Sequence, residues 1–277
     1  MEHEVVERAA RAVGRAEALV VTAGAGMGVD SGLPDFRGDE GFWRAYPPFA
    51  KLGLSFVDLA NPRWFRADPS LAWGFYGHRL NLYRAVVPHA GFAVLRRWFE
   101  QKAEGGFVFT SNVDGQFQKA GFAADRVFEC HGSIHLAQCA GGCGEGIFAP
   151  PERVDVDEAT MRARPPLPAC PGCGGIARPA ILMFGDGAWD SGPFDDQERR
   201  LLAWLRRIPL SSVCVVELGA GKAVPTVRHF GERLAVGGAT LVRINVREPD
   251  GSRGTIGVPL GAAAALAAID ARLADLP

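Results

Sequence analysis

The sequence predicts an α/β fold in which a doubly wound parallel sheet carries a smaller second lobe. The first observation is a series of short apolar runs that alternate with helical patterns along the chain. Runs that are apolar on both faces are typical of strands covered by helices on both sides, and their alternation with helices favours a parallel sheet. The second observation is that two segments, residues 41–87 and 137–177, interrupt this alternation.

The predicted strands and helices can be read from the spacing of apolar residues. Apolar runs that end in glycine or polar residues predict strands at residues 18–22, 106–110, 127–130, 212–216 and 240–244. Helical spacing predicts helices at about residues 2–16, 68–86, 89–103, 195–207, 224–236 and 258–275. Outside the two interrupting segments, strand and helix therefore follow one another in the order expected of a doubly wound sheet.

The two interrupting segments differ in composition from the rest of the chain. Residues 41–87 are rich in aromatic side chains, and residues 137–177 are rich in glycine, proline and cysteine. We interpret both as insertions that together form the small domain. The large domain is then formed by residues 1–40, 88–136 and 178–277.

Composition and charge exclude several classes of protein. The chain has 277 residues, with 30 Lys and Arg against 31 Asp and Glu, and a formal net charge of −1. A near-neutral chain lacks the positive charge of a protein that wraps nucleic acid, so we expect no nucleic-acid partner. No apolar run reaches the roughly 18 residues of a membrane span, and the acidic start at residues 1–4 is unlike a secretory leader. We expect a soluble, cytoplasmic protein without a membrane partner.

Four of the six cysteines form two closely spaced pairs, C-x3-C and C-x2-C, with 26 residues between them: Cys139, Cys143, Cys170 and Cys173. Glycines beside each pair allow the backbone to turn towards a central ion. Four thiolates complete a tetrahedral Zn²⁺ site with no open position, so the spacing predicts a structural zinc site. The alternatives are two disulfides or free buried thiols, and a cytoplasmic setting disfavours the disulfides.

Two glycine-rich loops follow predicted strands. The first, residues 24–32, has the small residues that let a backbone approach a pyrophosphate, but Val29 replaces the third glycine of the dehydrogenase fingerprint. The second, residues 219–222, is no Walker loop, because Val216 and Ala223 replace two of its required residues. Hydride transfer and phosphoryl transfer are therefore disfavoured, and either loop alone could be a tight turn.

Together with the motifs that follow them, these loops resemble the sirtuins, a family of NAD-dependent protein-lysine deacylases. The Thr-Ser-Asn-Val-Asp-Gly run at residues 110–115, the His-Gly-Ser run at residues 131–133 and the four cysteines follow in the family's order. Further matches lie at residues 178–186, 219–221 and 244–245. The resemblance covers about residues 15–265 and implies a Rossmann-like large domain that binds NAD, beside a helical and zinc-ribbon small domain.

The resemblance also implies the residues that bind NAD. The pyrophosphate would lie on the amides near Gly24, while Asn112 and Asp114 would hold the nicotinamide and ribose end. Phe36 would shield the ribose C1′ atom after nicotinamide leaves, and Arg37 would order its loop. The full predicted set is Gly24, Ala25, Gly26, Asp35, Phe36, Arg37, Ser111, Asn112, Asp114, His131, Gly219, Ala220, Gly221 and Asn245.

The implied catalytic residues are His131, Asn112 and Asp114. In the implied reaction the acyl oxygen of a modified lysine attacks the ribose C1′ atom as nicotinamide departs. A neutral His131 then takes the proton of the 2′-hydroxyl, which attacks the carbon of the resulting imidate. Hydrolysis by water then yields free lysine and 2′-O-acyl-ADP-ribose. A histidine buried for packing alone is the alternative for His131.

The implied substrates are acyl-lysine proteins or peptides. The peptide would add as an extended strand beside Leu182, Phe184 and Gly185, opposite residues 221–224. Tyr76 and Arg79 have the Tyr-x-x-Arg form found in family members that remove succinyl, malonyl or glutaryl groups, and they could bind a terminal carboxylate. Ala60 would leave room for the longer acyl chain. In the alternative, Tyr76 only packs and Arg79 pairs with a surface carboxylate.

Several residues depart from the family pattern near the implied NAD site. Ser111 replaces a glutamine, Phe117 a histidine and Arg247 a glutamate, while Ala220 and Gly221 remove two hydroxyls. These departures leave open an NAD glycohydrolase or a protein ADP-ribosyltransferase on the same fold. A non-catalytic NAD sensor and a zinc ribbon that docks a partner are further alternatives, and the sequence leaves the oligomeric state open.

Overall fold

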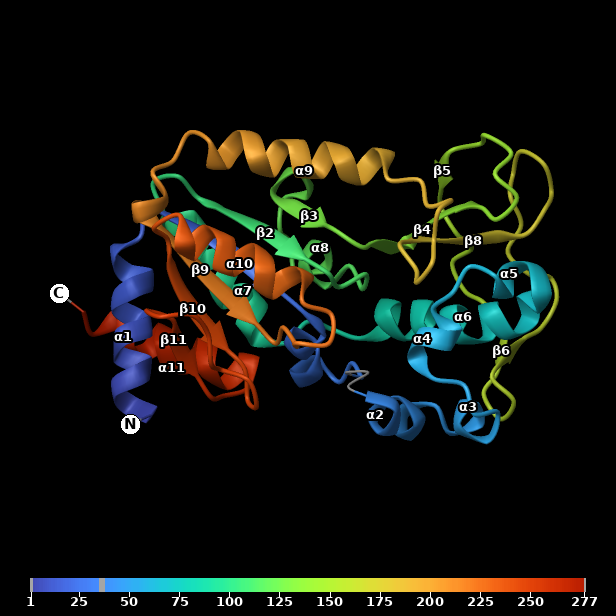
Figure 1. Cartoon of the computed structure of the whole chain (residues 1–277), viewed down its shortest axis with the longest axis horizontal. Coiled ribbons are helices and arrows are strands. Elements are labelled where there is room, and N and C mark those ends of the chain that lie inside the picture. Colours follow the sequence, from blue (N-terminus) through green and yellow to red (C-terminus); the bar gives the residue numbers. More distant parts are fainter. Residues whose placement is uncertain (1, 35–37, 277) are drawn as a thin grey trace.

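The computed structural model describes residues 2–34 and 38–276 and is built around a six-stranded parallel sheet (Figure 1). The strand order is β11-β10-β9-β1-β2-β3, and each neighbouring pair is parallel. The strands are β1 Ala18–Ala23, β2 Gly106–Thr110, β3 Val127–Glu129, β9 Val213–Leu218, β10 Thr240–Ile244 and β11 Ile256–Val258. The predicted doubly wound fold is confirmed.

Helices cover both faces of this sheet because successive side chains of each strand point to opposite sides. In β1, Leu19 and Val21 join a core packed by α1, α7 and α11, whereas Ala18 and Val20 join a core packed by α9 and α10. These helices are α1 Glu2–Arg15, α7 Ala90–Gln101, α9 Gly192–Leu205, α10 Thr226–Val236 and α11 Ala262–Ala274. All five lie within a few residues of the predicted ranges.

Within the six-stranded sheet, one strand was missed by the sequence prediction. Residues 256–258 form β11, which pairs in parallel with β10 through Val242 and Ile256, whereas the pattern predicted a helix from about residue 258. A strand of three residues is too short to show the alternation of apolar and polar residues that marks a strand. The spacing of apolar residues in the alanine-rich helix after it therefore led to a predicted helix from about residue 258.

The small lobe combines the two insertions. Its helices are α2 Gly38–Ala45, α3 Pro47–Lys51, α4 Phe56–Leu59, α5 Trp64–Ala67 and α6 Pro69–Ala85. Its strands are β4 Gly132–Cys139, β5 Ile147–Phe148 and β8 Ala177–Ile181, which form an antiparallel sheet, and the hairpin pair β6 Val156–Asp157 and β7 Arg162–Ala163. Figure 1 shows this lobe on the right, beyond the sheet.

A shared aromatic core holds the two insertions together. Phe42, Tyr46, Phe49 and Phe75 pack with ring centroids 5.4–6.0 Å apart, and the same buried cluster includes Met161 and Ala163 of the second insertion. The aromatic residues of one insertion therefore supply the core that the short strands of the other lack. The exact domain bounds given above stay a prediction.

The order of the strands places a crevice beside β1. The chain passes from β1 to β2 on one side, whereas β9 pairs with β1 on the other side. Ligands of doubly wound sheets bind at such a switch point, outside the carboxyl ends of the strands.

The short helix α8 Gln116–Lys119 and the 3-10 helices η1 Ala25–Met27, η2 Val29–Ser31, η3 Ala124–Arg126 and η4 Leu210–Ser212 lie in the connections. Within residues 2–34 and 38–276, no helix is long and apolar enough to span a membrane.

Candidate functional site

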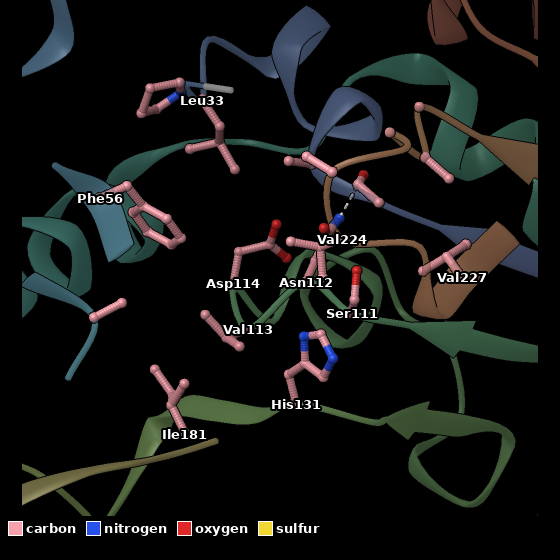
Figure 2. Close-up of a pocket in the computed structure, with 18 of the residues that line it drawn as sticks. Leu33, Phe56, Ser111, Asn112, Val113, Asp114, His131, Ile181, Val224 and Val227 are labelled. Atoms are coloured by element: carbon pink, nitrogen blue, oxygen red, sulfur yellow. Dashed lines mark hydrogen bonds between the residues drawn. The ribbon is translucent and has the colours of Figure 1, made fainter. Parts of the chain in front are cut away.

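A cavity of about 680 Å³ lies at the carboxyl edge of the sheet and brings most of the predicted site residues together. It opens between the loops that follow β1, β2, β3 and β9 on one side and α6 of the small lobe on the other (Figure 2). The predicted residues that line it are Gly24, Ala25, Ala60, Tyr76, Arg79, Ser111, Asn112, Asp114, His131, Leu182, Phe184, Gly219, Ala220 and Gly221.

The two glycine-rich loops form one wall of the cavity by packing backbone on backbone. Gly26 N donates to Gly219 O at 3.0 Å, and Gly24 N donates to Leu218 O at 3.0 Å. A Cβ atom on Gly24 would lie 2.9 Å from Ala220 Cα, closer than real Cβ contacts. Glycine is therefore needed for the approach of the two loops. Gly26 itself does not line the cavity but supports the loop that does.

The segment after β2 carries two of the predicted catalytic residues. Asn112 Nδ2 donates to Gly24 O at 3.0 Å, the hydrogen bond drawn in Figure 2, so this amide is tied to the first glycine-rich loop. Asp114 is buried, and its Oδ1 accepts from Gln116 N at 2.9 Å. Burial raises the pKa of Asp114 to about 6, against the opposing effects of the Gln116 amide and the Arg79 charge.

His131 lies between β3 and β4, with its ring directed into the cavity towards Ser111 and Asn112 (Figure 2). Its backbone is fixed by neighbours, since His131 O accepts from Leu182 N at 3.0 Å. The following Gly132 has φ +83°, and a Cβ atom there would collide with Ala180 O, so the turn requires glycine. Burial lowers the pKa of His131 below its usual 6.5, which keeps the ring neutral at pH 7.

The predicted acyl pocket is formed by α6 and is buried. Arg79 is only 7% exposed and lies over the rings of Phe75 and Tyr76, with centroid distances of 5.1 and 5.7 Å. Its Nε donates to the hydroxyl of Tyr83 at 3.0 Å. Arg79 therefore faces the cavity with the rings of α6 around it, not the outer surface of the small lobe.

The segment after β8 forms the open rim of the cavity. Phe184 is 39% exposed, and its backbone N donates to Ala60 O at 2.9 Å. A buried ion pair between Arg178 and Asp186 closes this segment into a loop, and Arg178 Nη2 also donates to Ile181 O at 2.7 Å. Gly185, predicted to contact substrate, does not line the cavity.

Asn245 does not line the cavity but holds the loops that form it. Its Nδ2 donates to Ala220 O at 2.9 Å, and its Oδ1 accepts from the backbone N–H groups of Arg247 and Glu248 at 3.0 Å. It therefore joins the second glycine-rich loop to the loop after β10. Asp35, Phe36 and Arg37 lie outside the described residues, so their roles stay predictions.

The four paired cysteines lie together at the end of the small lobe. The Sγ atoms of Cys139 and Cys173 are 3.7 Å apart, those of Cys143 and Cys170 are 3.5 Å apart, and all four lie within 4.8 Å of one another. Zn–S bonds of about 2.3 Å place tetrahedral sulfur atoms about 3.8 Å apart. The cluster therefore fits a structural Zn²⁺ ion.

Comparison with known proteins identifies the family. A model described as the Sir2 family matches residues 24–195. The chain belongs to the Sir2 family. A relative from Aeropyrum pernix, named NAD-dependent protein deacylase, is 30% identical over 259 residues, which are 93% of this chain and 92% of the relative.

Another relative and a solved structure agree with this membership. NAD-dependent protein deacylase sirtuin-5, mitochondrial, from Danio rerio is 30% identical over 254 residues, with coverage of 84% and 75%. The crystal structure of a Sir2 homolog–NAD complex has the same fold, with a TM-score of 0.73 at 23% identity over 97% of this chain and 94% of that one.

Several residues that line the Sir2-family cavity were not predicted from the sequence. They are Leu33, Pro34, Phe56, Tyr83, Val113, Ile181, Met183, Val227 and Glu248. Most are apolar or lie beside a recognised motif. Tyr83 could have been found, because it lies four residues after Arg79 and so one turn further along the same helix face.

Loss of one zinc ligand should release the metal and destabilise the small lobe of this Sir2-family protein. We expect Cys170→Ser to lower the zinc content well below one ion per chain and to lower the melting temperature, because Cys170 is buried within the cluster. Metal analysis and thermal denaturation measure both effects. Cys214→Ser, a buried thiol in β9, should retain zinc, and equal zinc in both variants would contradict the assignment.

Proposed function

We propose that this chain removes acyl groups from lysine side chains of proteins with NAD as co-substrate, and that it prefers acyl groups that end in a carboxylate. The observation that carries the proposal is that Arg79 lines the same cavity as His131 and Asn112. A buried cation in the substrate cavity selects for a negative charge on the ligand, because charge-assisted hydrogen bonds are stronger in a desolvated site.

The residues present fit NAD. Gly24 and Gly219 keep the two loops in backbone contact, and Gly221 has open space on the side where a Cβ atom would stand. Small residues at these positions let backbone amides approach a pyrophosphate. When bound, NAD supplies an activated ribose carbon and the hydroxyls that receive the acyl group.

The side chains around the cavity would then bind and move protons. Neutral His131 is placed to accept a proton from a ribose hydroxyl, because burial lowers its pKa and its ring faces the cavity. Asn112 is held by its bond to Gly24 O and would fix the nicotinamide end together with Asp114. Both roles depend on the loops after β2 and β3, which carry these side chains to the cavity.

The protein substrate would enter at the exposed rim. Phe184 and Leu182 on one side and Val224 on the other are each 39–44% exposed, although all three are large and apolar. An extended peptide between them would be held by its main chain and by its acyl-lysine in the cavity. The acyl chain would pass Ala60 towards Tyr76 and Arg79.

Replacing Arg79 tests the acyl preference. We expect Arg79→Met to lower kcat/KM for a succinyl-lysine peptide by about tenfold or more, because a charge-assisted hydrogen bond in a buried site is lost. Mass spectrometry of peptide products with NAD measures the rates. The acetyl-lysine peptide of the same sequence is the control and should be deacylated at a nearly unchanged rate.

An equal loss with both peptides would refute the carboxylate preference but leave the deacylase activity standing. A control without peptide separates deacylation from simple cleavage of NAD. Nicotinamide released at the same rate without an acyl peptide would instead favour an NAD glycohydrolase.

A further inference from the structure

Helix α6 presents three polar side chains on one face of the cavity. Tyr76, Arg79 and Tyr83 are spaced three and four residues apart, so they follow one another along the same side of the helix. All three line the cavity, and Arg79 and Tyr83 are 7% and 5% exposed. Tyr76 and Arg79 belong to the Tyr-x-x-Arg motif, whereas Tyr83 lies outside it.

The contact between Arg79 and Tyr83 determines how the guanidinium is oriented. Arg79 Nε donates to the Tyr83 hydroxyl at 3.0 Å, and the guanidinium carbon lies 5.3 Å from the Tyr83 ring centroid. A guanidinium can bind a carboxylate in two bidentate ways, side-on through Nε and one Nη, or end-on through both Nη atoms. Because Tyr83 holds Nε, a carboxylate that replaced no existing bond of Nε would meet Arg79 end-on.

Tyr83 is itself held in place by the segment that carries the predicted catalytic residues. Gln116 Nε2 donates to Tyr83 O at 3.3 Å, and Gln116 N donates to Asp114 Oδ1 at 2.9 Å. Gln116 is 1% exposed, so this link is buried. The main chain of Tyr83, near the end of α6, is therefore tied to the segment after β2.

We propose that Tyr83 is a positioning residue for acyl-chain selection, whose hydroxyl holds Arg79 Nε so that both Nη atoms face the terminal carboxylate of the acyl group. The proposal rests on the proposed function, because it matters only if Arg79 binds such a carboxylate. Binding of the acyl carboxylate would then depend on the Tyr83 hydroxyl as well as on the positive charge of Arg79.

The test is a double-mutant cycle between Tyr83 and Arg79, with succinyl-lysine and acetyl-lysine peptides of one sequence. We expect Tyr83→Phe to raise the KM for the succinyl peptide about fivefold, with kcat and all acetyl-peptide constants nearly unchanged. In the Arg79→Met background, Tyr83→Phe should have no further effect on the succinyl peptide. Additive effects of the two substitutions would overturn the proposal.

Two further variants keep the test informative if Tyr83→Phe unfolds. Arg79→Lys keeps the positive charge but removes the Nε donor, so it should raise the succinyl KM at least as much as Tyr83→Phe does; an unchanged succinyl KM would refute the proposal. Tyr46→Phe is the matched control, because Tyr46 is buried in the same lobe but its hydroxyl lies 3.2 Å from His78 Nδ1. A similar rise in the succinyl KM with Tyr46→Phe would show a general packing effect and refute the proposal.

The same data separate failure of this inference from failure of the proposed function. If wild type and Arg79→Met remove succinyl groups equally well, the carboxylate preference itself is wrong. If Arg79→Met is selective for the succinyl peptide but Tyr83→Phe is not, only the role of Tyr83 is wrong.

Discussion

Replacing His131 with alanine should lower kcat for deacylation by about a thousandfold, within the range contributed by a positioned general base. The ring faces Ser111 and Asn112 in the cavity, and burial lowers its pKa, so the neutral form that accepts a proton dominates at pH 7. Product formation is followed by mass spectrometry of the peptide. His229→Ala on the exposed surface of α10 is the control and should leave kcat unchanged.

The pH dependence gives a second readout of the same residue. A base must be unprotonated to act, and a lowered pKa keeps His131 unprotonated down to below pH 6.5. We therefore expect kcat to be flat from pH 7 to 8 and to fall only in the acid range. Asp114, with a pKa of about 6, loses its charge in the same range, so Asp114→Asn should remove one of the two ionisations.

A thousandfold loss of kcat in His131→Ala is incompatible with a histidine that serves packing alone. A wild-type kcat in His131→Ala would refute the role of His131 as the general base.

The parts of this fold that the sequence predicted are those in which neighbouring residues carry the signal. Strand β1 is apolar on both faces, and that alone indicates a strand covered by helices on both sides. The four cysteines were predicted together because metal ligands come in local pairs of fixed spacing. His131 was predicted because the His-Gly-Ser run at residues 131–133 resembles a sirtuin motif.

The parts that were missed depend on which elements become neighbours. Glu217 of β9 and Arg243 of β10 are directly paired in register and form an ion pair buried in the sheet. Each is a single charge in an apolar run, and only the pairing of the two strands shows that they neutralise one another. The position of Asn245 below the cavity likewise depends on the contact between two loops that are 25 residues apart in sequence.

Replacing Gly219 with alanine should raise the KM for NAD by about a hundredfold, the cost expected when a binding loop is displaced by about 1 Å. Gly219 has φ +60°, and a Cβ atom there would overlap the backbone of Gly26. Because the atoms that the Cβ would meet belong to the backbone, no side chain can move aside, and the two loops must separate. Their hydrogen bond from Gly26 N to Gly219 O would then be lost.

The control separates this collision from the strain that alanine suffers at a positive φ. Gly254 has φ +96° but no atom within 4 Å of the place where a Cβ would stand, so Gly254→Ala adds strain without a collision. Gly254→Ala should lower the melting temperature slightly and leave the KM for NAD unchanged. A similar KM for NAD in both variants would mean that backbone contact between the two loops is not what forms the dinucleotide site. A raised KM in Gly219→Ala alone, with zinc content and folding retained, would locate NAD binding at the contact between the loops after β1 and β9.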